Sequence, residues 1–329
     1  MAHHYSFTFE QQLGSNLVAS AAYVGTQGRH LLRFTTPNLG PSSTVVPTSL
    51  NVFRVAIFQD QFNRPVFFGR IMSPARPVSG IGAINMFETT ASSRYDSLQL
   101  QMRGRLARSL QFQAAYTLSK AVDDVSDVFD LAGAPALPQN SLTLAGERGP
   151  ANFDVRHRFS YNFIYSFPAF RDRSRAFRLL FDGLEVAGTG QLRTGQPFTV
   201  NSIIDVNLDG NLTDRLNSTD GIIVTGERRR PLQLATDNAF SLLAPFGQDG
   251  AVGRNTFRAG NVLEFDFSVI RSFAFSGSQS LTFRTDFFNV INRANFGIPA
   301  RFLEAPGFGQ ATSTVTPGRR IQFALKYLF

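Results

Sequence analysis

The sequence predicts an all-β fold, an antiparallel transmembrane β-barrel, from three observations. Apolar and polar side chains alternate along about nine segments. These segments are as long as the roughly 9–11 residues that cross a bilayer as a tilted strand. The connections between them alternate between short and long, as do the periplasmic turns and extracellular loops of outer-membrane barrels.

The composition excludes several other classes of protein. The 329 residues include 34 phenylalanines but no cysteine, which excludes a disulfide scaffold, a thiolate zinc site and a cysteine nucleophile. A charged fraction of 17% beside so many aromatic residues is not that of a disordered chain. No apolar run approaches the roughly 18 residues of a membrane helix. Residues 1–4 have no basic or apolar leader character, so we expect no signal peptide in this chain.

The predicted strands follow from one pattern, because neighbouring side chains of a strand point to opposite faces of the sheet. The first four are residues 5–10, 17–23, 97–103 and 111–119. In the second of these, one face is apolar and the other is mixed.

The fifth predicted strand, residues 153–167, alternates most clearly. Its odd positions from 157 to 167 are one histidine and five aromatic residues, whereas its even positions are almost all polar. We expect His157 to be an interfacial residue of the aromatic face rather than a metal ligand. The last four predicted strands are residues 184–193, 263–269, 281–287 and 320–329.

The connections decide between two folds that share this alternation. A soluble β-sandwich would also place apolar side chains on one face. It rarely needs several connections longer than about 15 residues, however, and those expected here are residues 26–93, 123–152, 204–261 and 292–318. The strand count is odd, whereas bacterial single-chain barrels have even numbers of strands. We therefore expect either the last part of a larger barrel or an extra hairpin hidden at Asn51–Phe58 and Pro65–Phe68.

Several short motifs occur in an order that is typical of one family. The chain resembles the C-terminal barrel region of TonB-dependent outer-membrane receptors of the Oar-like type over most of residues 90–329. The motifs are Ser93-Arg94-Tyr95-Asp96-Ser97-Leu98-Gln99, Tyr116-Thr117-Leu118-Ser119-Lys120 with Asp123-Asp124, Glu147-Arg148-Gly149, Phe153-Asp154-Val155-Arg156-His157-Arg158-Phe159, Thr194-Gly195-Gln196-Pro197-Phe198, Phe287-Phe288-Asn289-Val290-Ile291-Asn292, Asn295-Phe296-Gly297 and Arg319-Arg320-Ile321-Gln322-Phe323-Ala324-Leu325-Lys326.

The resemblance implies a barrel of roughly 22 strands around an N-terminal plug. It also implies uptake of a scarce ligand in the bacterial outer membrane, powered by the TonB complex. We expect residues 1–329 to be the C-terminal portion of such a receptor, because the plug, the TonB box and the N-terminal module are not in this sequence. The expected partners are the TonB complex acting through the missing plug, the barrel assembly machinery, outer-membrane lipid and lipopolysaccharide, and an unidentified small ligand.

Two sets of residues have expected roles within this barrel. The polar faces of three strands are expected to line the lumen or contact the plug through Gln99, Gln101, Arg103, Glu264, Asp266, Arg284 and Asp286. The last strand resembles the C-terminal recognition strand that the barrel assembly machinery reads in outer-membrane proteins. The residues expected to form this signal are Phe323, Tyr327 and Phe329.

One segment has the spacing of a calcium loop. Oxygen-bearing side chains stand at every second position, and Gly210 follows in sixth place, as in the first half of an EF-hand loop. Leu216 occupies the twelfth place, where an EF-hand has its bidentate glutamate. The expected Ca²⁺ ligands are Asp205, Asn207, Asp209, Asn211 and Asp214. The alternative is an ordinary turn-rich loop, because Asp, Asn and Gly also favour turns.

Other activities have no sequence support. We expect no enzyme and no required cofactor, since no nucleophile–base set or phosphate-binding loop suggests itself. The net charge of +8 comes from scattered arginines, which argues against nucleic acid. Two alternatives to energy-coupled transport stay open, a passive porin or structural barrel and a soluble secreted β-sandwich that binds carbohydrate.

Overall fold

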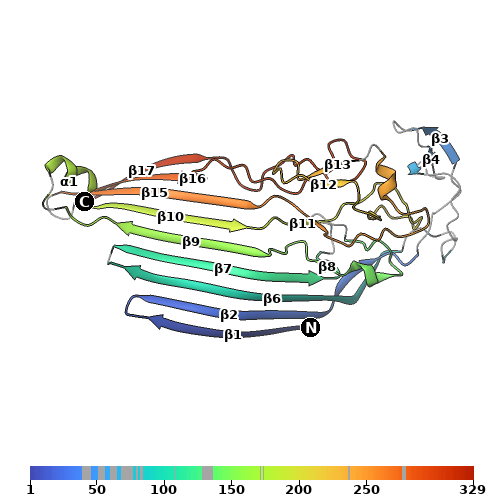
Figure 1. The fold of residues 1–329 in the computed structure, drawn as a ribbon, viewed down its shortest axis with the longest axis horizontal. Coiled ribbons are helices and arrows are strands. Elements are labelled where there is room, and N and C mark those ends of the chain that lie inside the picture. The colour runs from blue at the N-terminus through green and yellow to red at the C-terminus, as the bar shows by residue number, and fades with distance from the viewer. Residues whose placement is uncertain are drawn as a thin grey trace.

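A computed structural model describes residues 1–38, 46–50, 56–59, 65–67, 77–78, 81, 84–107, 109–127, 136–170, 172, 174–235, 238–275 and 279–329. One antiparallel sheet dominates the fold and follows the chain from one edge to the other (Figure 1). Its strands are β1 (Ala2–Leu13), β2 (Leu17–Thr35), β6 (Met86–Leu106), β7 (Leu110–Asp123), β9 (His157–Ser166), β10 (Leu184–Arg193), β15 (Val262–Ala274), β16 (Ser280–Phe288) and β17 (Arg320–Leu328). The two-residue strand β8 (Gly149–Pro150) also pairs with β7.

These nine long strands coincide with the nine segments that the alternation predicts, so the all-β antiparallel prediction is confirmed. One boundary differs from the prediction, because β9 begins at His157 and not at Phe153. The Asp154 carboxylate accepts a hydrogen bond from the Ala121 backbone N–H at 2.7 Å, which holds residue 154 in a turn before the strand. Within the described residues, β1 and β17 each pair with one strand of this sheet, so the sheet is open at both edges.

The remaining described strands form small sheets away from the main one. They are β11 (Pro197–Phe198) with β14 (Phe257–Arg258), β12 (Ile222–Val224) with β13 (Leu232–Leu234), and β3 (Val46–Leu50) with β4 (Ala56–Gln59) and β5 (Pro65–Phe67). The described parts of the hairpin expected at Asn51–Phe58 and Pro65–Phe68 are β4 and β5, which pair with each other outside the main sheet. In the main sheet β2 pairs directly with β6. Residues 51–55 and Phe68, which are parts of that expected hairpin, lie outside the described residues.

The cross-strand register separates an apolar face from a polar face. Across five neighbouring strands, one row of paired residues consists of Leu100, Tyr116, Phe159, Leu192 and Leu263. The row displaced by one residue consists of Gln101, Ala115, Ser160, Gln191 and Glu264. The alternation along each strand is therefore matched by its neighbours, and the sheet has one continuous apolar surface.

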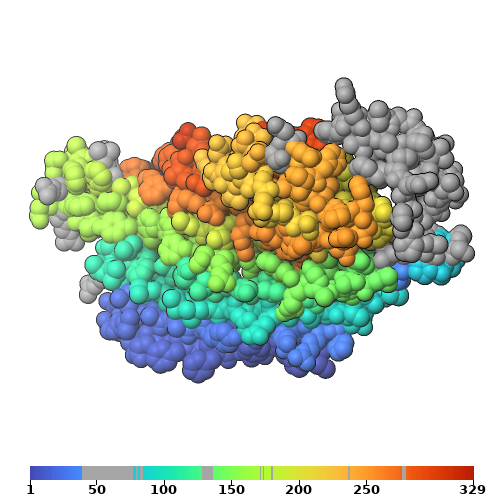
Figure 2. All heavy atoms as spheres, turned by 45° about the vertical axis from the view of Figure 1, so that its right-hand side comes forward, coloured from blue at the N-terminus to red at the C-terminus, as the bar shows by residue number. Residues whose placement is uncertain are grey.

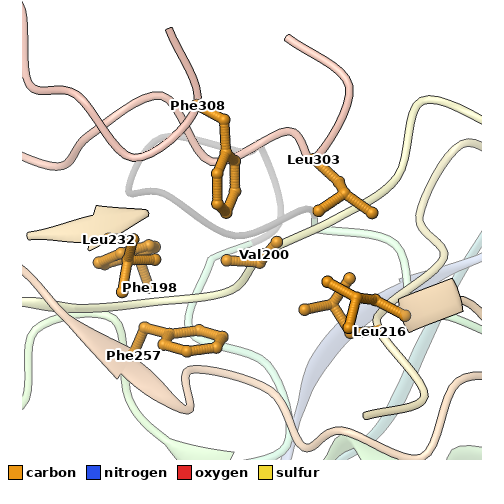
Figure 3. Close-up of a cluster of buried hydrophobic side chains, with 8 residues drawn as sticks. Phe198, Val200, Leu216, Leu232, Phe257, Leu303 and Phe308 are labelled. Carbon is orange, nitrogen blue, oxygen red and sulfur yellow. The ribbon is translucent and has the colours of Figure 1, made fainter. Parts of the chain in front are cut away.

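The apolar surface is not the hydrophobic core of the molecule. Phe7 of β1 is 73% exposed and Phe323 of β17 is 67% exposed, whereas Phe198 of the short strand β11 is fully buried. The buried apolar cluster lies in the long connections (Figure 3). A soluble sandwich would bury the aromatic rows of its strands between two sheets, so this alternative is wrong.

The two ends of the sheet differ in the length of their connections, as predicted. The turns β1–β2, β6–β7, β9–β10 and β15–β16 lie at one end, and the longer connections lie at the other (Figure 1). The described helices are α1 (Arg175–Phe181), in the β9–β10 connection, and the 3₁₀ turns η1 (Leu144–Glu147) and η2 (Ala239–Leu242) in long loops. In Figure 2 the loop of residues 194–261, yellow to orange, forms a compact mass of side chains.

Candidate functional site

The two longest described loops, residues 194–261 and 289–319, fold into one assembly, which we call the loop cap. Its apolar cluster is formed by Phe198, Val200, Leu216, Leu232, Leu242, Phe257, Leu303 and Phe308 (Figure 3). The ring centroids of Phe198 and Phe257 are 6.0 Å apart, on the paired strands β11 and β14. Segments about 100 residues apart in sequence are therefore held together by apolar burial.

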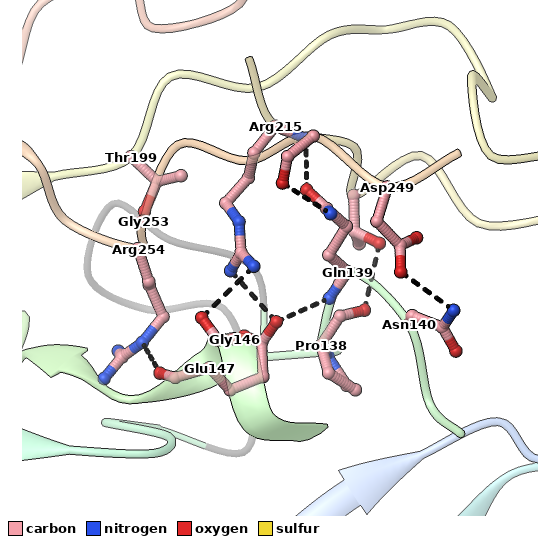
Figure 4. Close-up of polar contacts among 12 residues, drawn as sticks. Pro138, Gln139, Asn140, Gly146, Glu147, Thr199, Arg215, Asp249, Gly253 and Arg254 are labelled. Atoms are coloured by element: carbon pink, nitrogen blue, oxygen red, sulfur yellow. Dashed lines mark hydrogen bonds and ion pairs between the residues drawn. The ribbon is translucent and has the colours of Figure 1, made fainter. Parts of the chain in front are cut away.

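A buried ion pair fixes the loop cap to the connection before β9. Arg215 Nη1 lies 2.9 Å from Glu147 Oε1, and both side chains are more than nine-tenths buried (Figure 4). The same carboxylate oxygen accepts a hydrogen bond from the Gln139 backbone N–H at 3.1 Å. The Gln139 side chain in turn accepts from the Arg215 backbone N–H at 2.8 Å and donates to the Gly250 carbonyl at 3.0 Å. Three distant segments thus share one polar network.

A second set of arginines joins the loop cap to the ends of β7 and β9. Arg254 pairs with Asp123, the last residue of β7, and its Nε donates to the Glu147 carbonyl at 2.9 Å. Arg258 pairs with Asp154 in the same way, just before β9. These contacts anchor the loops to the rigid sheet, which is how a scaffold positions a binding surface.

A cavity of about 540 Å³ opens within the loop cap, between the β13–η2 segment and residues 303–308. Its wall is mostly apolar and includes Leu234, Phe240 and Phe308. Two charged residues, Arg230 and Glu304, also line it. The Glu304 carboxylate accepts hydrogen bonds from Ser202 Oγ at 2.6 Å and from the Ile203 backbone N–H at 3.0 Å. An apolar cavity of this size with few polar groups is suited to a small ligand.

The predicted calcium residues lie close together in the loop cap. Asp205 accepts hydrogen bonds from the backbone N–H groups of Asp209 and Gly210 at 3.0 and 2.9 Å. The carboxylate of Asp214 accepts from the backbone N–H groups of Val206 and Asn207 at 3.1 and 3.3 Å. Gly210 has a φ of +89°, which explains the glycine of the motif. The side chains of Asp205 and Asp214 therefore hold this segment in a tight loop through backbone N–H groups.

The charges of this loop are poorly compensated. Burial, together with the charge of Asp205, raises the pKa of Asp209 to about 7. Burial and the charges of Asp205 and Asp209 raise the pKa of Asp214 to about 8. Among the described residues, no group of three or more His, Asp and Glu side chains has an arrangement that could hold a metal ion. Calcium binding by Asp205, Asn207, Asp209, Asn211 and Asp214 stays a prediction.

The seven residues expected to line the lumen share the polar face of the sheet. Gln99, Gln101 and Arg103 lie on β6, Glu264 and Asp266 on β15, and Arg284 and Asp286 on β16. Two of these residues, Arg284 and Asp286, form an ion pair on that face, with 2.9 Å between Arg284 Nε and Asp286 Oδ1. Gln191 Nε2 donates to Glu264 Oε2 at 3.2 Å across two strands. Their contact with a plug stays a prediction.

Comparison with known proteins identifies the family. Residues 1–322 match the family model described as outer membrane beta barrel domain. The chain belongs to this family. Membership accounts for the exposed apolar surface, because the outward side chains of a membrane barrel contact lipid while its inward side chains are polar. No helix in the described part of the chain is long and apolar enough to cross a membrane.

A similar solved structure is that of the outer membrane transporter YddB from Escherichia coli, at 12% identity and a TM-score of 0.46. The match covers 98% of this chain and 32% of that chain, so this outer membrane beta barrel domain spans about a third of the transporter's length. No curated protein matches the chain.

The C-terminal strand of the domain has its aromatic side chains on the outward face. Phe323 lies over Phe283 of β16, with centroids 6.2 Å apart, and the rings of Tyr327 and Phe329 are stacked at 6.0 Å. Phe329 is 92% exposed. These rings contribute little to packing within the chain, and their role as an assembly signal stays a prediction.

Sequence reasoning missed the network that builds the loop cap. The ion pairs that join Glu147 to Arg215 and Asp154 to Arg258 could not be predicted from the sequence. A buried arginine cannot be recognised from its neighbours in the sequence, because arginines in polar loops are mostly exposed to solvent. Only the three-dimensional contacts identify Gln139 as the central residue of the network.

Proposed function

We propose that this domain is the C-terminal part of the barrel of a TonB-dependent transporter of the Oar-like type. In this proposal the loop cap binds a scarce ligand outside the cell, and uptake through the barrel depends on a plug and on the TonB complex. The resemblance of the ordered motifs in residues 90–329 supports this function, and so does the loop cap itself. The proposal includes no reaction and no nucleic-acid partner.

One observation carries the proposal, namely the cavity inside a loop cap that buried ion pairs anchor to the sheet. A porin loop needs no ordered cavity of about 540 Å³, whereas a receptor that selects a ligand does. Arg230 and Glu304 lie in the wall of that cavity and would orient polar groups of the ligand. The polar rows of the sheet lead from the loop cap toward the short-turn end.

The experiment is solute accumulation by cells that produce the intact receptor. Energised cells and cells treated with a protonophore are compared by mass spectrometry of their contents. We expect at least one solute to accumulate only in energised cells, and to be lost in a variant with Leu234→Asp and Phe308→Asp in the cavity. Uptake that is equal with and without the protonophore would instead identify a passive porin.

A further inference from the structure

The helix α1 is an unusual element for the end of a sheet at which the other connections are tight turns. It begins after Ser174, whose Oγ accepts from the Phe177 backbone N–H at 3.3 Å. It ends at Phe181, and the backbone N–H of Asp182 then donates to the Arg178 carbonyl at 2.9 Å. Arg178 also forms an ion pair with Asp182, with 3.3 Å between Nε and Oδ2. The connection is therefore ordered by its own contacts.

Aromatic rings continue the outward face of the sheet onto this helix. Tyr165 of β9 belongs to the outward face, and its ring centroid is 4.9 Å from that of Phe167. The ring centroids of Phe167 and Phe181 of α1 are 6.2 Å apart, and those of Phe181 and Phe177 are 4.5 Å apart. Phe170 packs edge-on against Phe177 at 5.1 Å. This cluster, the rim aromatic cluster, places the apolar side of α1 beside the lipid-facing surface.

Three described arginines, Arg175, Arg178 and Arg271, lie on or beside α1, and Arg178 is paired with Asp182. Residues 168–183 contain four arginines and two aspartates. Arg175 is exposed, and so is the larger part of the Arg178 side chain. On the outward face of β15, Arg271 lies with its guanidinium carbon 4.5 Å from the centre of the Phe273 ring. The carbon that a side chain at Gly183 would add lies 2.9 Å from Arg271 Nη1, so this arginine is next to the end of α1.

We propose that α1 and Arg271 form an interfacial site for anionic phospholipid headgroups at the short-turn rim of the barrel. The rings of the rim aromatic cluster lie at the boundary of the hydrocarbon, as aromatic girdles do, and Arg175, Arg178 and Arg271 contact lipid phosphates. Lipid is the occupant because the cluster is continuous with the lipid-facing surface and because the charge is complementary to phosphate. This site is independent of the proposed transport function, since it lies at the end of the sheet opposite the loop cap (Figure 1).

The test uses fluorescence, because the 329-residue chain contains no tryptophan. The full chain with Phe177→Trp is reconstituted into vesicles of phosphatidylcholine and phosphatidylglycerol in which one of the two lipids carries bromine near the headgroup. The variant Phe163→Trp, on the outward face of β9, is the insertion control: quenching of its fluorescence shows that the sheet is inserted in the preparation. Phe246→Trp in the loop cap is the reporter that should not be quenched.

We expect strong quenching of Phe177→Trp and a preference for brominated phosphatidylglycerol of roughly fivefold for each arginine that contacts the lipid. The added changes Arg175→Gln and Arg178→Gln should abolish most of this preference, whereas Arg228→Gln with Arg229→Gln in the loop cap should leave it unchanged. Ala176→Trp is a second reporter if Phe177→Trp disturbs the helix. No quenching of either reporter in inserted preparations, or equal quenching by both lipids, would overturn the inference.

Discussion

Replacing Glu147 by glutamine should loosen the loop cap without disturbing the sheet. The substitution keeps the size of the side chain and an oxygen that can accept from the Gln139 backbone N–H. It removes the negative charge 2.9 Å from Arg215 Nη1. Arg215 then remains buried with its Nη2 donating to the Gly146 carbonyl at 3.3 Å, while its Nε already has no hydrogen-bond partner in the structure.

The expected magnitude follows from the burial of both partners. Breaking a buried ion pair by removing one charge costs about 3–5 kcal/mol, because the other charge stays uncompensated. Since each 1.4 kcal/mol changes an equilibrium constant by a factor of ten, the fraction of molecules with an open loop cap should rise roughly 10²- to 10⁴-fold. The pair between Arg148 and Asp124, 3.1 Å apart, offers the matched control, because Arg148 is about half exposed and Asp124 also lies near Arg33. Arg148→Gln should cost at most about 1 kcal/mol.

Hydrogen exchange measures this opening residue by residue. The amides of Asn217 and Val252 donate to the carbonyls of Leu242 and Leu216 at 2.8 Å, so both report on the loop cap. Both should exchange faster in Glu147→Gln, while amides within β7 and β9 should not change. The double variant Glu147→Met with Arg215→Met should recover most of the protection, because no charge is left buried. Unchanged exchange of Asn217 and Val252 in Glu147→Gln would refute the assigned role of the ion pair.

Three further predictions concern the loop motif, a glycine and the C-terminus. Since the folded pKa values of Asp209 and Asp214, about 7 and about 8, lie above the unfolded value of about 4, the folded loop binds extra protons. The protection of its amides from hydrogen exchange should therefore fall as the pH rises from 4 through 8. If the carboxylates bind Ca²⁺, millimolar Ca²⁺ should restore this protection at pH 8.5. The absence of heat in a calorimetric titration with Ca²⁺ would contradict calcium binding. Gly195→Ala should destabilise the loop cap by about 3 kcal/mol in denaturant titrations, because the new carbon would lie 1.8 Å from the Ala259 carbonyl oxygen, whereas Gly253→Ala meets its nearest atom at 3.7 Å and should be tolerated. Deletion of Phe329 should slow assembly into the outer membrane in a cell-based assay yet leave the stability of the folded protein unchanged; normal assembly would count against the C-terminal signal.

The sheet could be predicted because its pattern is local. A strand in a membrane barrel has Phe, Tyr and Leu on one face and polar side chains on the other, so apolar and polar residues alternate along each segment of the sequence. Phe159 pairs with the apolar residues Tyr116 of β7 and Leu192 of β10. Asn162, on the other face, pairs with the polar residues Gln113 and Thr189. The long loops and short turns then fixed which ends of the strands lie together.

The loop cap could not be predicted because its contacts join distant residues. Glu147 and Arg215 are 68 positions apart, and Asp123 and Arg254 are 131 apart, so no spacing rule connects them. The Asp205–Asp214 motif was visible because its hydrogen bonds lie within ten residues. The helix α1 was not predicted, because its seven residues are too few to show a helical period in the sequence.

The most direct test of the central claim is the labelling of single cysteines along one strand, because the chain contains no cysteine of its own. Variants such as Leu100→Cys, Gln101→Cys and Met102→Cys on β6 are inserted into vesicles and treated with a water-soluble maleimide. Rapid labelling at position 101 and protection at positions 100 and 102 is the predicted result. Equal labelling at all three positions, or protection at 101 alone, would contradict a sheet whose apolar face contacts lipid.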